Sequence, residues 1–166
     1  MMKICVAGVA KGHDQEFSFE TEVGELDIPK DVCEFDGKIS VEGTVCTTGE
    51  NYRAQGVIRC RKKFLCDRCL KPSAVEQIHE FSEDYCTVAE RAERESVNYT
   101  DGSTIDITEL VRDTLLAAQP LSNLCKPDCR GLCPVCGTDL NEGTCDCDTS
   151  TVDPRLAVLQ QFKKQV

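Results

Sequence analysis

Six of the thirteen cysteines lie within the 23 residues from Cys125 to Cys147, and no other feature constrains the fold of this chain as strongly. Their spacing is C-x3-C-x3-C-x2-C-x8-C-x-C. At the centre of the stretch, Cys133-Pro-Val-Cys136-Gly has the form of a metal knuckle, a tight turn whose backbone N–H groups point back at a thiolate. Gly137 permits the positive φ that this turn needs. We therefore expect the segment to fold around bound metal or around disulfides.

The cellular compartment decides between metal and disulfides. The run Ile4–Ala10 is apolar over too few residues for a secretory signal and lacks a small-residue cleavage pattern after it. No run in the sequence approaches the length of a membrane span. We expect a cytoplasmic location, where thiols stay reduced. The cysteine spacing then favours metal binding over disulfides or unligated thiols.

Zinc is the metal that this composition favours. Four thiolates in a tetrahedral arrangement suit zinc, and iron, as a single ion or a cluster, is the alternative. The chain has six Phe, three Tyr and no Trp, so large apolar side chains are scarce. A structural zinc site would compensate, because such a site supplies about 10–16 kcal/mol at neutral pH.

A further pair, Cys66 and Cys69, follows a predicted strand. A lone C-x-x-C motif can be a redox dithiol, but that role expects the pair at a helix N-terminus after a parallel strand. Here Leu70–Ser73 has the composition of a turn. Half of a zinc site is the better interpretation of this pair.

Together these eight thiols would satisfy two sites of four thiolates. One site would use Cys66, Cys69, Cys125 and Cys129, and the other would use Cys133, Cys136, Cys145 and Cys147. The alternative is a single zinc within residues 125–147, with the remaining thiols free. The isolated Cys5, Cys33 and Cys46 have no metal spacing and are expected to act as small buried hydrophobic residues.

The same motifs resemble those of the YceD-like bacterial family, the large ribosomal RNA subunit accumulation proteins. The matching segments are Cys66–Leu70, Cys129–Gly137, Leu140–Glu142, Cys145–Cys147 and Asp153–Leu156. They cover the chain from Phe64 to its C-terminus, and the residues before Phe64 match only in general character. The resemblance implies a role with large-subunit ribosomal RNA or its precursor particles. It names no reaction.

The charge distribution bears on nucleic-acid binding. Nineteen Lys and Arg against 29 Asp and Glu give a net charge of −10, which argues against a free-standing nucleic-acid binder. Residues 51–75 are the exception, since seven basic and one acidic residue sum to +6 there. One basic island therefore lies in an acidic sequence.

This island lies on a predicted strand, Ala54–Cys66. Because side chains alternate along a strand, Arg59, Arg61 and Lys63 share one face. One interpretation is a charge ladder in which Glu76 and Glu80 lie opposite the basic side chains. The other is a surface that follows the phosphates of structured RNA. Its residues would be Arg59, Arg61, Lys62, Lys63 and Arg68.

The pattern predicts an α+β fold, with a mostly antiparallel β-sheet, one amphipathic covering helix and a C-terminal cysteine-rich zinc-binding segment. The expected strands are Lys3–Ala7, Glu16–Val23, one through Ile39–Val45, Ala54–Cys66 and Ile78–Tyr85. The expected helices are Ala89–Glu95 within an exposed loop, Asp106–Ala118 with Asp106 capping it, and one that begins at Asp153. The predicted organisation is a core domain (1–122), a zinc-binding segment (123–148) and a closing helix (153–164).

No catalytic constellation is apparent, because the thiolates have no nearby histidine and would leave no open position on a zinc ion. Three hypotheses remain. The first is a non-catalytic zinc-bound factor that supports accumulation, processing or assembly of large-subunit ribosomal RNA. The second is a thiol redox or metal-buffering protein. The third is an acidic adaptor that binds a basic ribosomal protein without contacting RNA.

Overall fold

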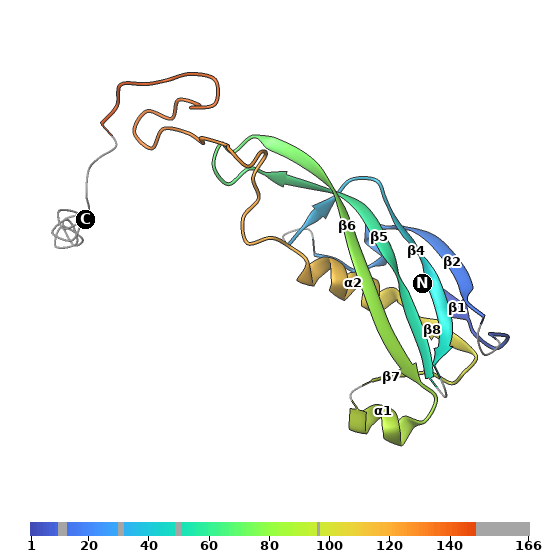
Figure 1. Ribbon diagram of the computed structural model, residues 1–166. Helices are drawn as coiled ribbons and strands as arrows, with labels where there is room; N and C mark the ends of the chain where they lie inside the picture. Colours follow the sequence, from blue (N-terminus) through green and yellow to red (C-terminus); the bar gives the residue numbers. More distant parts are fainter. Residues whose placement is uncertain (10–12, 30–31, 49–50, 96, 149–166) are drawn as a thin grey trace. The chain divides into compact units, whose positions relative to one another are not determined.

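The computed structural model describes residues 1–9, 13–29, 32–48, 51–95 and 97–148 (Figure 1). The chain divides into two compact units. Unit 1 contains Met1–Phe64 and Pro72–Leu121, and unit 2 contains Leu65–Lys71 and Ser122–Val166. Unit 2 therefore combines two segments that are far apart in the sequence. The predicted closing helix from Asp153 lies outside the described residues.

Unit 1 is built on a six-stranded sheet with the order β2-β4-β5-β6-β7, in which β3 also pairs with β5. These strands are β2 (Gln15–Glu22), β3 (Glu34–Phe35), β4 (Lys38–Thr48), β5 (Asn51–Leu65), β6 (Pro72–Cys86) and β7 (Asn98–Tyr99). A separate two-stranded sheet pairs β1 (Lys3–Cys5) with β8 (Thr104–Asp106). The helical elements are η1 (Val23–Glu25), α1 (Ala89–Glu95) and α2 (Thr108–Ala117).

The sheet is mostly antiparallel, as predicted, but it is mixed. The pairing of β6 with β7 is parallel, because the chain returns through α1 before it adds β7 to the sheet edge. β5 and β6 are longer than predicted, and β6 begins at Pro72, within the turn predicted after Cys69. None of the helices in the described part of the chain is both long and apolar enough to cross a membrane.

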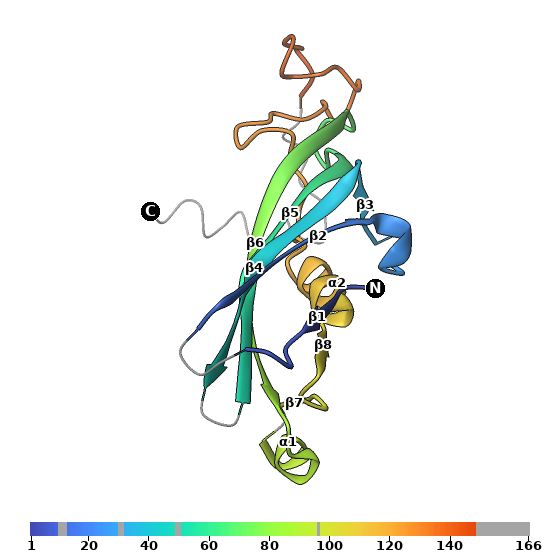
Figure 2. The same ribbon diagram turned by 90° about the vertical axis from the view of Figure 1, so that its right-hand side faces the viewer.

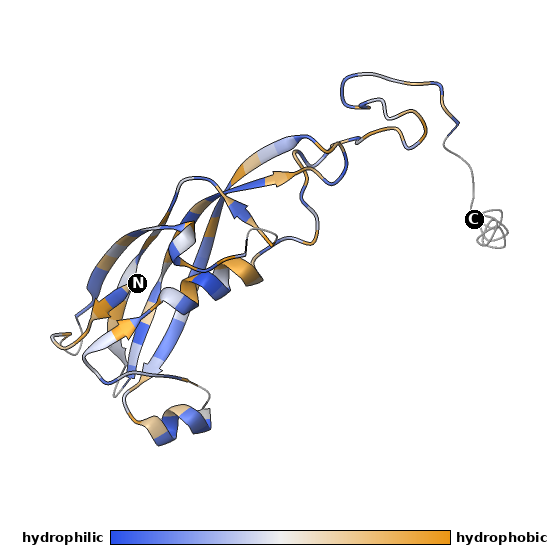
Figure 3. Cartoon of the chain, turned by 180° about the vertical axis from the view of Figure 1, so that it is seen from behind, coloured by the Kyte–Doolittle hydropathy of each residue, from blue (hydrophilic) through white to orange (hydrophobic). Residues whose placement is uncertain are grey.

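The core of unit 1 lies between one face of the sheet and α2 (Figures 1 and 2). Burial alternates along β4 and β5, and hydrophilic and hydrophobic residues alternate along the strands in Figure 3. The fully buried sheet residues include Ile39, Val41, Val45 and Ile58, and α2 buries Val111 and Leu115. The predicted cap at Asp106 is wrong, because Asp106 ends β8 and the N-cap residue of α2 is Ile107, which makes no side-chain cap hydrogen bond. The Thr108 N–H does donate to Asp106 Oδ1, at 3.0 Å, one residue before the N-cap. A period-two pattern facing a helical stripe thus produces the predicted two layers.

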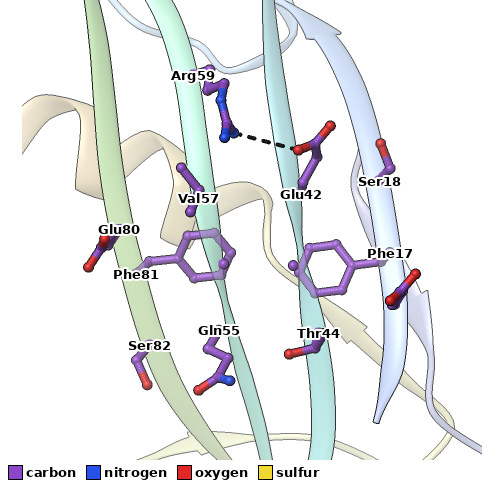
Figure 4. Close-up of a pocket in the computed structure, with 13 residues that line it drawn as sticks. Phe17, Ser18, Glu42, Thr44, Gln55, Val57, Arg59, Glu80, Phe81 and Ser82 are labelled. Atoms are coloured by element: carbon purple, nitrogen blue, oxygen red, sulfur yellow. Dashed lines mark ion pairs between the residues drawn. The ribbon is translucent and has the colours of Figure 1, made fainter.

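Two paired glycines interrupt this buried row. Gly43 on β4 lies opposite Gly56 on β5, and Phe17 on β2 lies opposite Gly43. The rings of Phe17 and Phe81 point toward one another across these strands, with centroids 6.5 Å apart (Figure 4). A Cβ at Gly43 would lie 2.2 Å from the Gln55 carbonyl oxygen. The close approach of the two backbones therefore requires glycine here.

Candidate metal centres and the basic strand

The connection between β5 and β6 forms a tight turn around Cys66. The Leu70 N–H donates to the Cys66 carbonyl at 2.8 Å, and the Cys66 N–H donates to the Lys71 carbonyl at 3.0 Å. Leu70 has φ of 58°, a left-handed conformation that is unusual for a branched side chain. The turn brings Cys66 and Cys69 to the same side as two cysteines from the segment that follows α2.

The predicted knuckle at Cys133 has the same hydrogen-bonding pattern. The Gly137 N–H donates to the Cys133 carbonyl at 2.9 Å, and the Cys133 N–H donates to the Thr138 carbonyl at 2.8 Å. Gly137 has φ of 75°. The Val135 N–H also points at Cys133 Sγ, at 3.4 Å. The positive φ predicted for this glycine is confirmed.

The first cysteine group consists of Cys66, Cys69, Cys125 and Cys129. Its sulfur atoms all lie within 4.8 Å of one another, with separations of 3.8 Å for Cys66–Cys129 and 3.7 Å for Cys69–Cys125. A tetrahedral site with metal–sulfur bonds of about 2.3 Å would separate its sulfurs by roughly 3.8 Å. The group could hold a metal ion. All thirteen cysteines are free, so none of these contacts is a disulfide.

The second group consists of Cys133, Cys136, Cys145 and Cys147, whose sulfur atoms also lie within 4.8 Å of one another. It too could hold a metal ion. The two groups differ in exposure: in the first only Cys125 is exposed, whereas in the second only Cys133 is buried. The structure thus assembles the two sets of four that the two-site hypothesis assigns, and the second set is more open to solvent.

In both groups, ionisation of one thiol makes ionisation of its neighbours less favourable. Hydrogen bonds from the backbone of Cys125 and Cys69 lower the pKa of Cys66, while partial desolvation by the neighbouring atoms and the Cys129 thiol raise the pKa of Cys125. In the second group, hydrogen bonds from Thr138 lower the pKa of Cys136, which in turn raises the pKa of Cys147. One thiolate in each group therefore disfavours ionisation of its neighbours. A bound divalent cation would remove this conflict.

Hydrogen bonds within unit 2 hold its two segments together around the first group. Arg68 Nη1 donates to the Cys129 carbonyl at 2.7 Å, and the Leu132 N–H donates to the Arg68 carbonyl at 3.0 Å. Asn141 Nδ2 lies 3.5 Å from Cys129 Sγ. Lys71 forms ion pairs with Asp139, at 2.7 Å, and with Glu142.

The cysteine spacing gives no indication of these supporting residues. Sequence reasoning singled out Asn141 and Glu142 only as part of the segment Leu140–Glu142 that resembles the family. It offered no signal for Lys71 or Asp139, whose pairing depends on the tertiary structure.

The basic strand is β5, and its side chains divide between two faces as predicted. Arg59 and Lys63 are exposed, whereas Lys62 lies on the other face and is only 4% exposed. Lys62 packs near the Phe64 ring, with Nζ 6.0 Å from its centroid. Burial therefore removes Lys62 from any surface that could contact RNA.

Three cations of β5 have acidic partners, although not the predicted ones. Arg59 pairs with Glu42 at 3.5 Å (Figure 4), Lys63 pairs with Asp36 at 2.8 Å, and Arg53 pairs with Asp84 at 2.7 Å. Within the described residues, neither Glu76 nor Glu80 forms an ion pair, so that part of the charge-ladder prediction is wrong. Arg61 makes no ion pair with any described residue. A depression of about 990 Å³ on this sheet face is lined by three carboxylates, Glu16, Glu42 and Glu80, and by Arg59.

The part of the chain that matches a known protein family contains both cysteine groups. Residues 54–163, more than half of the chain, match the model of the family described as large ribosomal RNA subunit accumulation protein YceD. All eight clustered cysteines lie within these residues. No solved structure matches the chain.

Individual relatives match over 62 to 115 residues. An uncharacterized protein of Mycobacterium tuberculosis is 34% identical over 79 residues, which are 45% of this chain and 38% of the relative. An uncharacterized protein of Mycobacterium leprae is 26% identical over 115 residues, 66% of this chain and 52% of the relative. Large ribosomal RNA subunit accumulation protein YCED homolog 1, chloroplastic, of Arabidopsis thaliana is 31% identical over 62 residues, 37% of this chain and 19% of the relative. The chain thus spans only part of the length of the relatives that it matches.

Proposed function

The chain belongs to the YceD family of large ribosomal RNA subunit accumulation proteins, and from this membership we propose that it is a non-catalytic, metal-bound cytoplasmic factor that supports accumulation, processing or assembly of large-subunit ribosomal RNA. The observation that carries the proposal is the position of the two four-cysteine groups, which lie entirely within the matched residues. The family description names accumulation of an RNA and no reaction.

The metal that we propose is zinc, held by the two groups of thiolates. When bound, zinc would supply structural stabilisation and would neutralise the crowded thiolates. Four thiolates per ion leave no open position for a water ligand, in contrast to a catalytic zinc site. The residues of unit 2 then act as a scaffold: the two knuckle turns orient their thiolates, and Arg68 and Asn141 fix the backbone and sulfur of Cys129.

For contact with RNA we propose the exposed cations Arg59, Arg61 and Lys63 on β5 and, in unit 2, Arg68. Arg61 is the strongest candidate among them, because it is exposed and its guanidinium is not used in an ion pair with a described residue. Arg59 and Lys63 would have to exchange Glu42 and Asp36 for phosphates. The acidic remainder of the chain would limit non-specific binding to nucleic acid.

The experiment that tests the proposal is sedimentation of the tagged chain through a sucrose gradient of bacterial lysate at moderate salt. We expect co-migration with precursor large-subunit particles. The variant Cys133→Ser/Cys136→Ser should lose this co-migration, whereas Cys46→Ser, outside both groups, should retain it. Migration only as free protein, with precursor particles plainly present, would refute the proposed association.

The exposure of the second group favours one alternative, a thiol redox or metal-buffering protein. Thiol titration of the metal-loaded protein separates the two functions. Closed structural thiolates react slowly until the metal is removed, whereas a buffering or redox protein would react rapidly and release metal in proportion.

A further inference from the structure

A second cavity, of about 510 Å³, is lined by residues of unit 1 alone. Its lining residues come from β1, β6, β7 and β8, from the loop between β7 and β8, and from the first turns of α2. These strands and α2 are labelled in Figure 1. The carboxylates that line it are Glu83, Asp101, Asp106, Glu109 and Asp113. Lys3 is the single cationic side chain in its lining. The cavity therefore carries a strong negative charge, and this disfavours an anionic ligand such as a nucleic acid.

Tyr85 supplies an independent sign of a ligand. The residue lines the cavity but is only 5% exposed, and its hydroxyl has no hydrogen-bond partner among the described residues. Burial, together with the charges of Glu83 and Asp106, raises the pKa of Tyr85 to about 12, so the hydroxyl stays protonated at neutral pH. The Tyr85 side chain is thus largely buried, but its hydroxyl keeps some access to solvent, because it is not one of the fully buried polar atoms that lack a partner. A ligand in this cavity could therefore reach the hydroxyl and hydrogen-bond to it.

Three of the carboxylates retain capacity to accept hydrogen bonds. Glu83 accepts only one long hydrogen bond, of 3.4 Å, from the Asn98 side chain. Asp106 Oδ1 accepts from the Thr108 N–H, which leaves Oδ2. The Glu109 carboxylate has no hydrogen bond or ion pair with any described residue. Asp101, by contrast, accepts hydrogen bonds from the backbone N–H groups of Ser103 and Thr104, so its carboxylate stabilises the local turn.

An aromatic ring lies in the same cavity wall. Tyr99 on β7 is 57% exposed, although large aromatic side chains usually bury most of their surface. An exposed ring beside carboxylates suits a cationic side chain, because the ring face attracts the cation and the carboxylates accept its N–H groups. A guanidinium or ammonium group on an aliphatic stem satisfies both features.

We propose that this cavity, through Glu83, Tyr85, Tyr99, Asp106 and Glu109, binds an arginine or lysine side chain of a basic protein segment. The carboxylates would accept the charged N–H groups, and the Tyr85 hydroxyl would accept one more. The ring of Tyr99 would cover the cation and its stem. The proposal is independent of the role in ribosomal RNA accumulation, because it rests only on side chains of unit 1.

The test measures binding of a fluorescein-labelled arginine-rich peptide, and of a lysine-rich and an acidic peptide of equal length, to the full metal-loaded chain by fluorescence anisotropy. The site variant is Glu83→Gln/Glu109→Gln. The matched control is Glu16→Gln/Glu80→Gln, which changes the net charge equally but alters the depression on the sheet face. Tyr85→Phe removes only the hydroxyl. Circular dichroism and thermal unfolding establish that each variant is folded.

We expect the site variant to bind either basic peptide about tenfold more weakly, Tyr85→Phe a few-fold more weakly, and the control within about twofold of the unchanged protein. The acidic peptide should not bind. Equal losses in the site variant and the control would show only diffuse charge attraction and would overturn the proposal. Binding of Mg²⁺ or Ca²⁺, but of neither basic peptide, would also overturn it, since a metal held by the carboxylates would then explain the acidic cluster.

Discussion

Leu70 and Gly137 occupy the same position in two turns that share one backbone pattern. Each follows the second cysteine of a C-x-x-C motif, each has a positive φ, and each donates its N–H to the carbonyl of the first cysteine. Glycine has no side chain and adopts a positive φ easily, whereas the leucine Cβ makes this conformation unfavourable. The chain thus forms the same turn with a favourable residue at Gly137 and with an unfavourable one at Leu70.

This relationship predicts that the two positions respond differently to substitution. Gly137→Ala should lower the free energy of unfolding of the metal-loaded protein by about 1 kcal/mol, because a Cβ at this φ is strained even though it would meet no atom within 4 Å. Leu70→Gly should be neutral within about 1 kcal/mol, since relief of strain offsets the greater entropy of the unfolded chain. Urea unfolding measures both. A larger loss in Leu70→Gly than in Gly137→Ala would contradict the shared strain.

The two knuckles also show how far the sequence predicts the site. Cysteine spacing identifies the four pairs, because a C-x-x-C turn is local and needs few residues to specify it. Leucine carries no signal of positive φ, so the conformation of Leu70 could not be foreseen. The ion pair between Lys71 and Asp139 joins residues 68 positions apart, and only the tertiary structure brings them together.

For the fold as well, local patterns were predicted from the sequence, whereas contacts between distant residues were not. Period-two alternation predicts β4 and β5, and the amphipathic pattern of residues 106–118 predicts α2, since both are local patterns. The cap predicted at Asp106 was wrong, because that residue ends β8. The pairing partners of the basic strand were missed. Alternation gives the face of a side chain but not its neighbour, and β4 and the residues beside β3 supply Glu42 and Asp36 instead of Glu76 and Glu80.

Two separate metal sites predict a stepwise loss of metal. Cys66→Ser and Cys133→Ser should each reduce zinc from two ions to one per chain, because each removes a thiolate from a different group of four. Native mass spectrometry after equilibration with excess zinc measures the stoichiometry. Cys46→Ser should keep two ions. A single ion per unchanged chain at saturation would exclude the two-site arrangement.

Gly43 provides a test of the sheet packing. Gly43→Ala should lower the free energy of unfolding by about 1–3 kcal/mol, because the added Cβ would lie 2.2 Å from the Gln55 carbonyl oxygen and 2.7 Å from the Phe17 ring. Gly24→Ala makes the same chemical change where no atom lies within 4 Å of the new Cβ. Thermal unfolding should therefore separate the two variants by several degrees. Equal midpoints would show that β4 and β5 can move apart without cost.

The ion pair of Arg53 with Asp84 predicts a pH dependence. The hydrogen bond from Arg53 lowers the pKa of Asp84. A lowered folded-state pKa contributes stability above the unfolded value of about 3.9, and this contribution is lost as the pH falls through the folded value. Asp84→Asn should cost about 0.5 kcal/mol at most at pH 7, since the side chain is 39% exposed and solvent screens the pair.

Urea unfolding of the unchanged protein and Asp84→Asn over a pH series measures this dependence. The difference between the two should be constant from pH 7 to about 5 and shrink below about pH 4. Glu76→Gln, at a carboxylate without an ion pair, should show no such difference. If the difference in free energy of unfolding between the two proteins increased as the pH fell, the Asp84 carboxylate would not stabilise the folded protein.

Arg61 tests whether the basic strand contacts RNA. Arg61→Glu should weaken binding of a large-subunit precursor RNA fragment several-fold and reduce the slope of log affinity against log salt by about 1, as expected when one phosphate contact is lost. Arg112→Glu makes the same charge change on α2, where Arg112 already pairs with Asp113 at 3.1 Å. Filter binding over a salt series measures both. Both variants alter the net charge equally, so a difference between their slopes would indicate a specific phosphate contact at Arg61. Equal slopes would indicate that the basic side chains of β5 form ion pairs within the sheet and do not contact RNA.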